Sequence, residues 1–209
     1  MDVQQLLASR DLVLLAFDGP VAELPPPAPL ADRLRTMVEN ARMPRNVART
    51  RDPLAVLAYA STIGPATAVA VHAQLSRLEG EVLATAPTAP GVLEAVLAMT
   101  AAGTKVAVVG NLVPTAVRSF LVVHGLAEHV WRIAGRGGPD RNVLPPAPDL
   151  LTEVIRGRAA ESCVFVGGTD ADLAAGRAAG LSTYRYRRPT EPESEPPHWF
   201  AALAPVRKS

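Results

Sequence analysis

Acidic residues, glycines and one asparagine directly follow three apolar runs of this 209-residue chain. They fall into three groups: Asp18 and Gly19; Gly110 and Asn111; and Gly168, Thr169 and Asp172. A carboxylate can act as a general acid or base, and N–H groups at the start of a helix can bind an anion. We therefore take Asp18 as the candidate catalytic residue and the other six as candidate ligand-binding residues.

Short apolar runs predict the strands that must position these residues, at 12–17, 105–110, 130–135, 163–167 and 182–186. The first, second and fourth runs are almost continuously apolar, as expected for parallel strands covered on both faces. Helical patterns that end on glycine lie between them, at 91–103, 114–125 and 170–180. This alternation predicts an α/β fold with a doubly wound parallel sheet. Ligands of such sheets bind beyond the carboxyl ends of the strands, where the candidate residues fall.

One long segment interrupts the alternation of strands and helices. Between the first strand and the helix that begins at Gly91, the sequence has a proline-rich linker and helical patterns at 30–41, 53–61 and 65–84, with no strand. We predict a helical cap at 25–86, inserted after the first strand, and an α/β core made of 1–24 and 87–209.

Composition excludes several classes of protein. The net charge is +1, so neither nucleic acid nor an anionic membrane is an expected partner. No apolar run reaches the roughly 18 residues of a membrane span. The single cysteine and scattered histidines exclude a four-ligand zinc site, and the first residues do not resemble a signal peptide. We expect a cytoplasmic protein without a metal.

The order of the motifs carries a resemblance to a known family. The sequences FDGPV, VVGN, PPAPDLL and VFVGGTDADLAAGRAAG follow one another, with the helical insertion after the first. From about residue 12 to 186, the chain resembles the haloacid dehalogenase superfamily, in particular phosphoglycolate-phosphatase-like hydrolases with a helical cap. The resemblance implies that one Asp attacks phosphorus, that an Asp two residues later acts as acid and base, and that Mg²⁺ neutralises the phosphate. It also implies a Ser or Thr and a Lys that hold the phosphoryl oxygens.

The chain departs from this pattern at four positions. Ala16 stands in place of the attacking Asp, and Gly110 in place of the Ser or Thr. Pro145 falls at or next to the Lys position, and Gly168 replaces the first metal-binding Asp. The acid/base position keeps Asp18. None of the four replacements has a side chain that can do the same chemistry, so we predict that phosphoaspartyl catalysis is lost.

Two functions from different classes follow from these residues. The first is a ligand-binding or regulatory protein, or a repurposed catalyst with Asp18 as a lone acid or base, which holds a small anionic or apolar molecule under the cap without a cofactor. The alternative is a working phosphohydrolase that acts on a small phosphorylated metabolite, with Asp18 in the active site and Mg²⁺ bound. The sequence leaves open whether the protein is an enzyme. A third role is assembly of identical chains through the cap helices.

Some candidate residues also have simpler structural explanations. Asp18 could stabilise a turn, Asn111 could be the N-cap of the next helix, and Asp172 could favour a helix start. Arg136 and Arg141 flank a glycine-rich loop after the third strand. They suit either a phosphate contact or a solvated loop.

Overall fold

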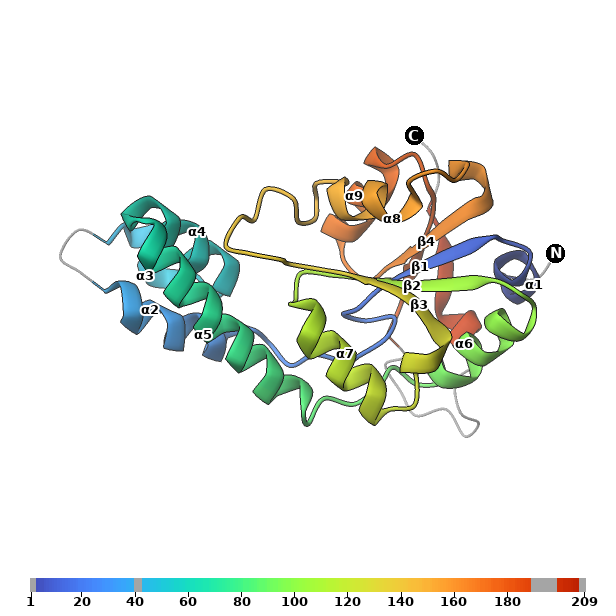
Figure 1. The fold of residues 1–209 in the computed structure, drawn as a ribbon, viewed down its shortest axis with the longest axis horizontal. Coiled ribbons are helices and arrows are strands. Elements are labelled where there is room, and N and C mark those ends of the chain that lie inside the picture. Colours follow the sequence, from blue (N-terminus) through green and yellow to red (C-terminus); the bar gives the residue numbers. More distant parts are fainter. Residues whose placement is uncertain (1–2, 40–42, 189–198, 207–209) are drawn as a thin grey trace.

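A single six-stranded sheet forms the centre of the protein, in the order β3-β2-β1-β4-β5-β6 (Figure 1). The computed structural model describes residues 3–39, 43–188 and 199–206. The strands are β1 (Leu12–Ala16), β2 (Lys105–Val109), β3 (Val130–Ala134), β4 (Cys163–Gly167), β5 (Ser182–Tyr186) and β6 (Leu203–Pro205). The first five are parallel, and β6 pairs antiparallel with β5. The five predicted strands and the α/β fold class are confirmed, whereas β6 was not predicted.

Helices cover both faces of the sheet because the strands alternate their apolar side chains between two hydrophobic clusters. Val13 and Leu15 of β1 face one cluster, while Leu12 and Leu14 face the other. The first face is covered by α1 (Val3–Ala8), α6 (Val92–Ala101) and α7 (Pro114–Val123). The second face is covered by α8 (Asp149–Ile155) and α9 (Asp170–Ala178). Short 3-10 helices lie at Ala127–His129, Ala160–Ser162 and Trp199–Ala202. No helix in the described part of the chain is long and apolar enough to cross a membrane.

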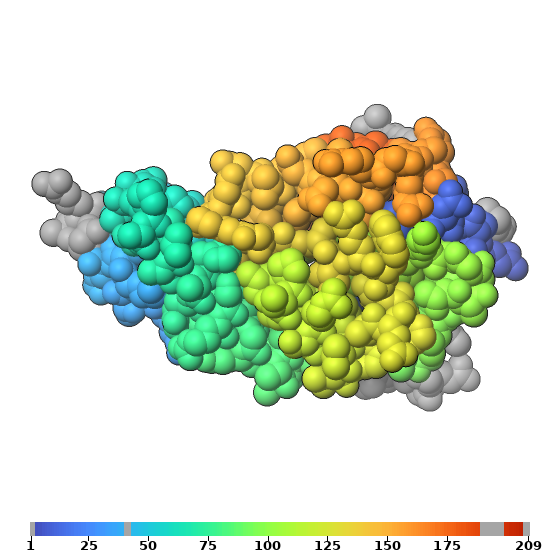
Figure 2. Space-filling model, in the orientation of Figure 1, coloured from blue at the N-terminus to red at the C-terminus, as the bar shows by residue number. Residues whose placement is uncertain are grey.

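Between β1 and α6, in the segment for which we predicted a cap, the described residues form four helices. They are α2 (Ala28–Val38), α3 (Arg45–Arg49), α4 (Pro53–Ile63) and α5 (Pro65–Leu83). Leu34, Leu57 and Leu75 belong to a hydrophobic cluster that α2, α4 and α5 form with one another. Figure 2 shows this helical insertion as a lobe at one end of an elongated molecule. Its separate cluster agrees with a division into two units, although the exact boundaries of 25–86 stay a prediction.

A buried ion pair joins the helical insertion to the core. Nη2 of Arg136, in the loop after β3, lies 2.5 Å from Oε1 of Glu79 on α5. The other carboxylate oxygen of Glu79 accepts the backbone N–H of Val113 (3.1 Å), and Nε of Arg136 donates to the carbonyl of Asn111 (3.2 Å). Arg136 is fully buried, and Glu79 is only 5% exposed. The pair therefore fixes α5 against the loops that follow both β2 and β3.

Burial makes this pair sensitive to the loss of either partner. Burial raises the pKa of Glu79, and the Arg136 guanidinium and the Val113 N–H oppose that shift. Removing one partner leaves the other without its counter-charge in a site that is almost closed to water. The stability of the insertion on the core thus depends on both residues being present.

We predict that Glu79→Gln and Arg136→Met each lower the free energy of unfolding by about 3–5 kcal/mol. The double variant should lose clearly less than the sum of the two, because it leaves no unpaired buried charge. Denaturant unfolding monitored by circular dichroism measures all three.

The same helix supplies a matched control. Arg77 and Glu81 on α5 form an exposed ion pair at 2.6 Å, and such pairs contribute about 0–1 kcal/mol. A coupling energy between Glu79 and Arg136 no larger than that between Arg77 and Glu81 would show that the buried pair does not hold the insertion.

Candidate functional site

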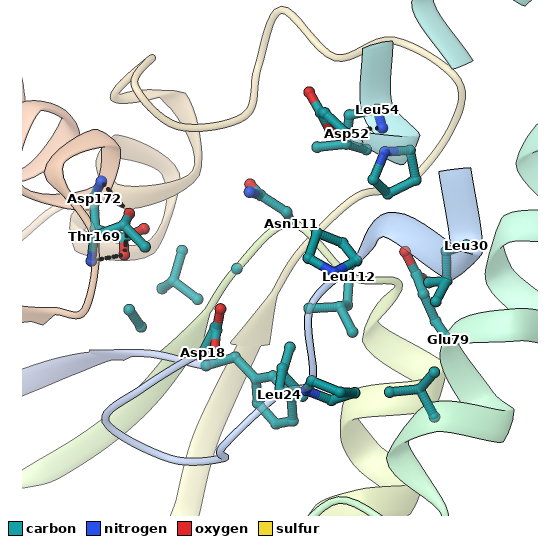
Figure 3. Close-up of a pocket in the computed structure, with 18 residues that line it drawn as sticks. Asp18, Leu24, Leu30, Asp52, Leu54, Glu79, Asn111, Leu112, Thr169 and Asp172 are labelled. Carbon is teal, nitrogen blue, oxygen red and sulfur yellow. Dashed lines mark hydrogen bonds between the residues drawn. The ribbon is translucent and has the colours of Figure 1, made fainter. Parts of the chain in front are cut away.

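A pocket of about 210 Å³ lies between the carboxyl ends of β1 and β2, the start of α9 and the helical insertion (Figure 3). Its polar lining residues are Asp18, Asp52, Glu79, Asn111, Thr169 and Asp172. Its apolar lining includes four leucines, Leu24, Leu30, Leu54 and Leu112. Among the described residues that line the pocket, none is a lysine, an arginine or a histidine. The lining is therefore largely apolar, and most of its polar side chains are acidic.

The pocket brings together candidate residues that are far apart in the sequence. Asp18, Gly110, Asn111, Thr169 and Asp172 all line it. The two remaining candidates are absent from its lining, Gly19 and Gly168. Sequence reasoning missed the residues that the insertion contributes, Leu30, Asp52, Leu54, Glu79 and Val82. No sequence signal marks them, because the helices of the insertion reach the carboxyl ends of the strands only in the folded chain.

Asp18 lies in a tight turn that directly follows β1. The carbonyl of Phe17 accepts the N–H of Ala22 (2.9 Å), and Gly19 has a positive φ of 93°. The buried indole of Trp199 donates to the carbonyl of Pro20 (2.8 Å) and holds the turn from outside. The turn points the Asp18 side chain into the pocket (Figure 3).

The surroundings of Asp18 disfavour its charged form. Water reaches the carboxylate from the pocket, but the protein walls desolvate it in part, and this raises its pKa. The N–H of Leu24 and the charge of Arg188 act in the opposite direction, while the nearby charge of Asp172 adds to the rise. A carboxyl group with a raised pKa in a pocket can exchange a proton more readily near neutral pH than an ordinary Asp.

The end of β2 provides less anion-binding capacity than expected. The N–H of Gly110 donates to the carbonyl of Ala134 (3.0 Å), so this group is already used inside the sheet. A Cβ at Gly110 would lie 3.2 Å from Cβ of Phe17, which leaves little room for a Ser or Thr. Asn111 is not the N-cap of α7, which is Val113. The alternative explanation of Asn111 as a helix cap is therefore wrong.

Asp172 occupies the N-terminal end of α9 with its own carboxylate. Its Oδ2 accepts the N–H of Gly168 (3.2 Å) and both the N–H and the hydroxyl of Thr169 (2.9 and 2.8 Å). The hydroxyl of Thr169 in turn accepts the N–H of Asp172 (3.2 Å), which completes a capping box. The simpler explanation for Asp172, a helix start, is the one that these contacts support.

Gly168 lies where the loop after β4 meets the turn after β1, at the carboxyl ends of these two strands. A Cβ built on Gly168 would lie 2.5 Å from the carbonyl oxygen of Asp18 and 3.3 Å from Cδ of Pro20. The N–H of Gly19 donates to the carbonyl of Ala22 (2.8 Å), so it too is used within the turn. The loop after β4 thus packs directly on the turn after β1, and a larger residue at 168 would push them apart.

The loop after β3 does not contribute to the pocket lining. Pro145, at the position implied for the phosphate-binding Lys, does not line the pocket, and no lysine lies between Lys105 and Lys208. Arg136 is buried against Glu79, whereas Arg141 is exposed. The idea that both arginines belong to a solvated loop is therefore wrong for Arg136.

Mg²⁺, which the resemblance implies, does not fit these residues. Asp172 already accepts three hydrogen bonds through Oδ2, and Gly168 has no side chain to offer. Within the described residues, no group of three or more His, Cys, Asp or Glu side chains is arranged to hold a metal ion. In proteins Mg²⁺ is usually held in an octahedral shell by one or two carboxylates, with waters and substrate phosphates completing the shell. Here Asp172, Asp52 and Glu79 are engaged by other groups of the protein, which leaves Asp18 without a second free carboxylate in the pocket lining.

No family model matches the chain, and no curated protein sequence does. Solved structures match it over most of its length. A predicted phosphoglycolate phosphatase from Haemophilus somnus 129PT is 20% identical, with a TM-score of 0.61 over 84% of both chains. CbbY from Rhodobacter sphaeroides, solved with phosphate, is 18% identical, with a TM-score of 0.59 over 85% of this chain and 86% of that chain.

A third solved structure also matches the chain. A HAD-superfamily hydrolase of subfamily IA from Geobacter sulfurreducens PCA is 18% identical, with a TM-score of 0.55 over 84% of this chain and 86% of that chain. At these identities the likeness concerns the fold alone. The protein has the haloacid dehalogenase-like hydrolase fold.

Proposed function

We propose that this protein binds a small molecule in the pocket between the sheet and the helical insertion, and that it does not carry out phosphoaspartyl chemistry. The observation that carries the proposal is the pocket itself: Ala16, which lines it, has no nucleophilic atom, and no described lining residue is cationic. A transferred phosphoryl group needs both a nucleophile and positive charge around its oxygens. The insertion would then act as a cap over a binding site.

Backbone geometry supports the same proposal. The phosphatase pattern requires an acid at position 168, but the backbone at Gly168 lies against the carbonyl of Asp18. An Asp there would need the two loops to separate. This close packing supports a site that does not hold a catalytic metal ion at position 168.

A second candidate function rests on Asp18. Its raised pKa and its position in an apolar pocket suit a lone general acid or base that works without a metal ion. A repurposed catalyst of this kind would need a ligand that gives up or takes a proton at the Asp18 carboxyl group.

We expect no turnover of p-nitrophenyl phosphate by the wild-type protein, either with Mg²⁺ or with a chelator. Asp18→Asn should behave in the same way. Release of p-nitrophenol, followed by absorbance, measures this. Turnover that requires Mg²⁺ and disappears in Asp18→Asn would contradict the proposal and favour a working phosphohydrolase.

We expect Gly168→Ala to lower the free energy of unfolding by about 1–3 kcal/mol, because its Cβ must displace the Asp18 carbonyl. Gly138→Ala is the matched control, since a Cβ there meets nothing within 4 Å. Denaturant unfolding compares the two. Equal stability of both variants would show that the space at position 168 is open.

Asp18→Asn should be more stable than the wild type at neutral pH. The pKa of Asp18 is raised in the folded protein, so the folded state favours the protonated form, and ionisation of Asp18 reduces stability as pH rises above 3.8, the ordinary pKa of an Asp. The gain should stay below about 1 kcal/mol, because water reaches the carboxylate, and it should vanish in acid.

Thermal unfolding of the wild type and of Asp18→Asn, from acidic to neutral pH, tests the prediction. Glu161→Gln also removes one negative charge, and it serves as the control. Glu161 lies two residues before β4, at the amino-terminal ends of the parallel strands, whereas Asp18 lies at their carboxyl ends. A variant at position 18 that is less stable than the wild type at neutral pH would mean that the carboxylate stabilises the fold.

A further inference from the structure

Most polar side chains that line the pocket are carboxylates, and none of the described lining residues is cationic. The N–H groups of Gly19, Gly110, Gly168 and Thr169 all donate to other groups of the protein. At the start of α9, where a bound anion could sit, the carboxylate of Asp172 is already in place. An anionic ligand would enter a pocket whose described lining carries four carboxylates, Asp18, Asp52, Glu79 and Asp172, and no cationic side chain.

The acidic groups of the pocket differ in how well their charges are compensated. Glu79 is paired with Arg136, and Asp172 is held by the first turn of α9. Asp52 caps α4 and accepts the N–H of Leu54 (2.9 Å). Asp18 has no side chain of opposite charge within ion-pair distance among the described residues, since Arg188 pairs with Glu23 (3.3 Å) instead.

An acceptor of another pocket-lining residue also lacks a partner. The side-chain oxygen of Asn111 is buried and accepts no hydrogen bond from the described residues. Figure 3 shows Asp18 pointing toward the space that Asn111 and Asp172 border. Because the Asn111 oxygen is closed off from the pocket, the acceptor that the structure offers to a ligand is the Asp18 carboxylate, which water reaches.

We infer that the pocket takes a small organic cation, with an ammonium group against the Asp18 carboxylate and an apolar body against the leucines. An ammonium carries a positive charge and three donors, which suits a carboxylate without an ion-pair partner. Leu24, Leu30 and Leu54 provide an apolar wall from the linker and the insertion. This inference rests on the proposed ligand-binding function and names the class of ligand.

A bare metal cation fits the site less well than an organic one. The acidic groups do not gather into a set of three that could coordinate an ion, within the described residues. The apolar wall would gain nothing from a hydrated ion, whereas a hydrocarbon body buries apolar surface there. The combination of one poorly compensated carboxylate and an apolar wall is what selects an amphipathic amine.

Isothermal titration calorimetry at low salt tests the inference with three probes that share one aromatic body: phenethylammonium, phenethyl alcohol and hydrocinnamate. We expect the ammonium to bind most tightly, the alcohol less tightly and the carboxylate least. Asp18→Asn should lower the affinity for the ammonium about 10- to 100-fold, the range for a charge-assisted hydrogen bond, while the affinity for the alcohol changes little. Glu161→Gln should change neither affinity.

Each contrary outcome has a distinct meaning. Failure of the ammonium to bind, or binding that Asp18→Asn leaves unchanged, overturns the inference. Equal binding of all three probes that Leu54→Trp abolishes by filling the pocket also overturns it, yet leaves ligand binding as the proposed function. Mg²⁺-dependent phosphatase turnover would overturn the proposed function itself, and it is measured independently of these probes.

Discussion

The buried ion pair between Glu79 and Arg136 determines where the helical insertion lies over the sheet. Glu79 also accepts the N–H of Val113, and Arg136 also donates to the carbonyl of Asn111. One pair therefore sets α5, the loop after β2 and the loop after β3 relative to one another. The pocket lies between these elements, and Glu79 itself lines it, so the shape of the pocket depends on this contact.

The charges around the pocket have a consistent arrangement. The guanidinium of Arg136 is paired with Glu79, and the N-terminal end of α9 is capped by the carboxylate of Asp172. The described lining of the pocket consists of several carboxylates, a carboxamide, a hydroxyl and a set of leucines, without a cationic side chain. In a site of this fold that handles phosphate, positive charge and free N–H groups would face inward. Here the fold is retained while the polarity of the site points to a different ligand.

Much of the fold could be predicted because it depends on local sequence patterns. Continuous apolar runs such as 12–17 and 163–167 predicted buried parallel strands, and the structure has β1 and β4 there. The strand β6 was missed because it has only three residues and lies at the edge of the sheet, where no apolar run is needed. The likeness to known folds came from the order of the motifs along the chain.

The site could be predicted only in part. Asp18 and Asn111 were found because they follow strands, and both line the pocket. Glu79 could not be found, since its partner Arg136 is 57 residues away and nothing in a helical pattern marks one acid as buried. The sequence also could not reveal that the N–H groups of Gly110 and Gly168 are used internally, because hydrogen-bond partners depend on how the loops pack.

The most direct test of the central claim is the intact mass of the protein after incubation with acetyl phosphate and Mg²⁺. If the site binds ligands without phosphoaspartyl chemistry, the mass stays that of the unmodified chain in the wild type and in Asp18→Asn. Stoichiometric addition of one phosphoryl group to the wild type, absent from Asp18→Asn, would contradict the account and restore a catalytic role in phosphoryl transfer.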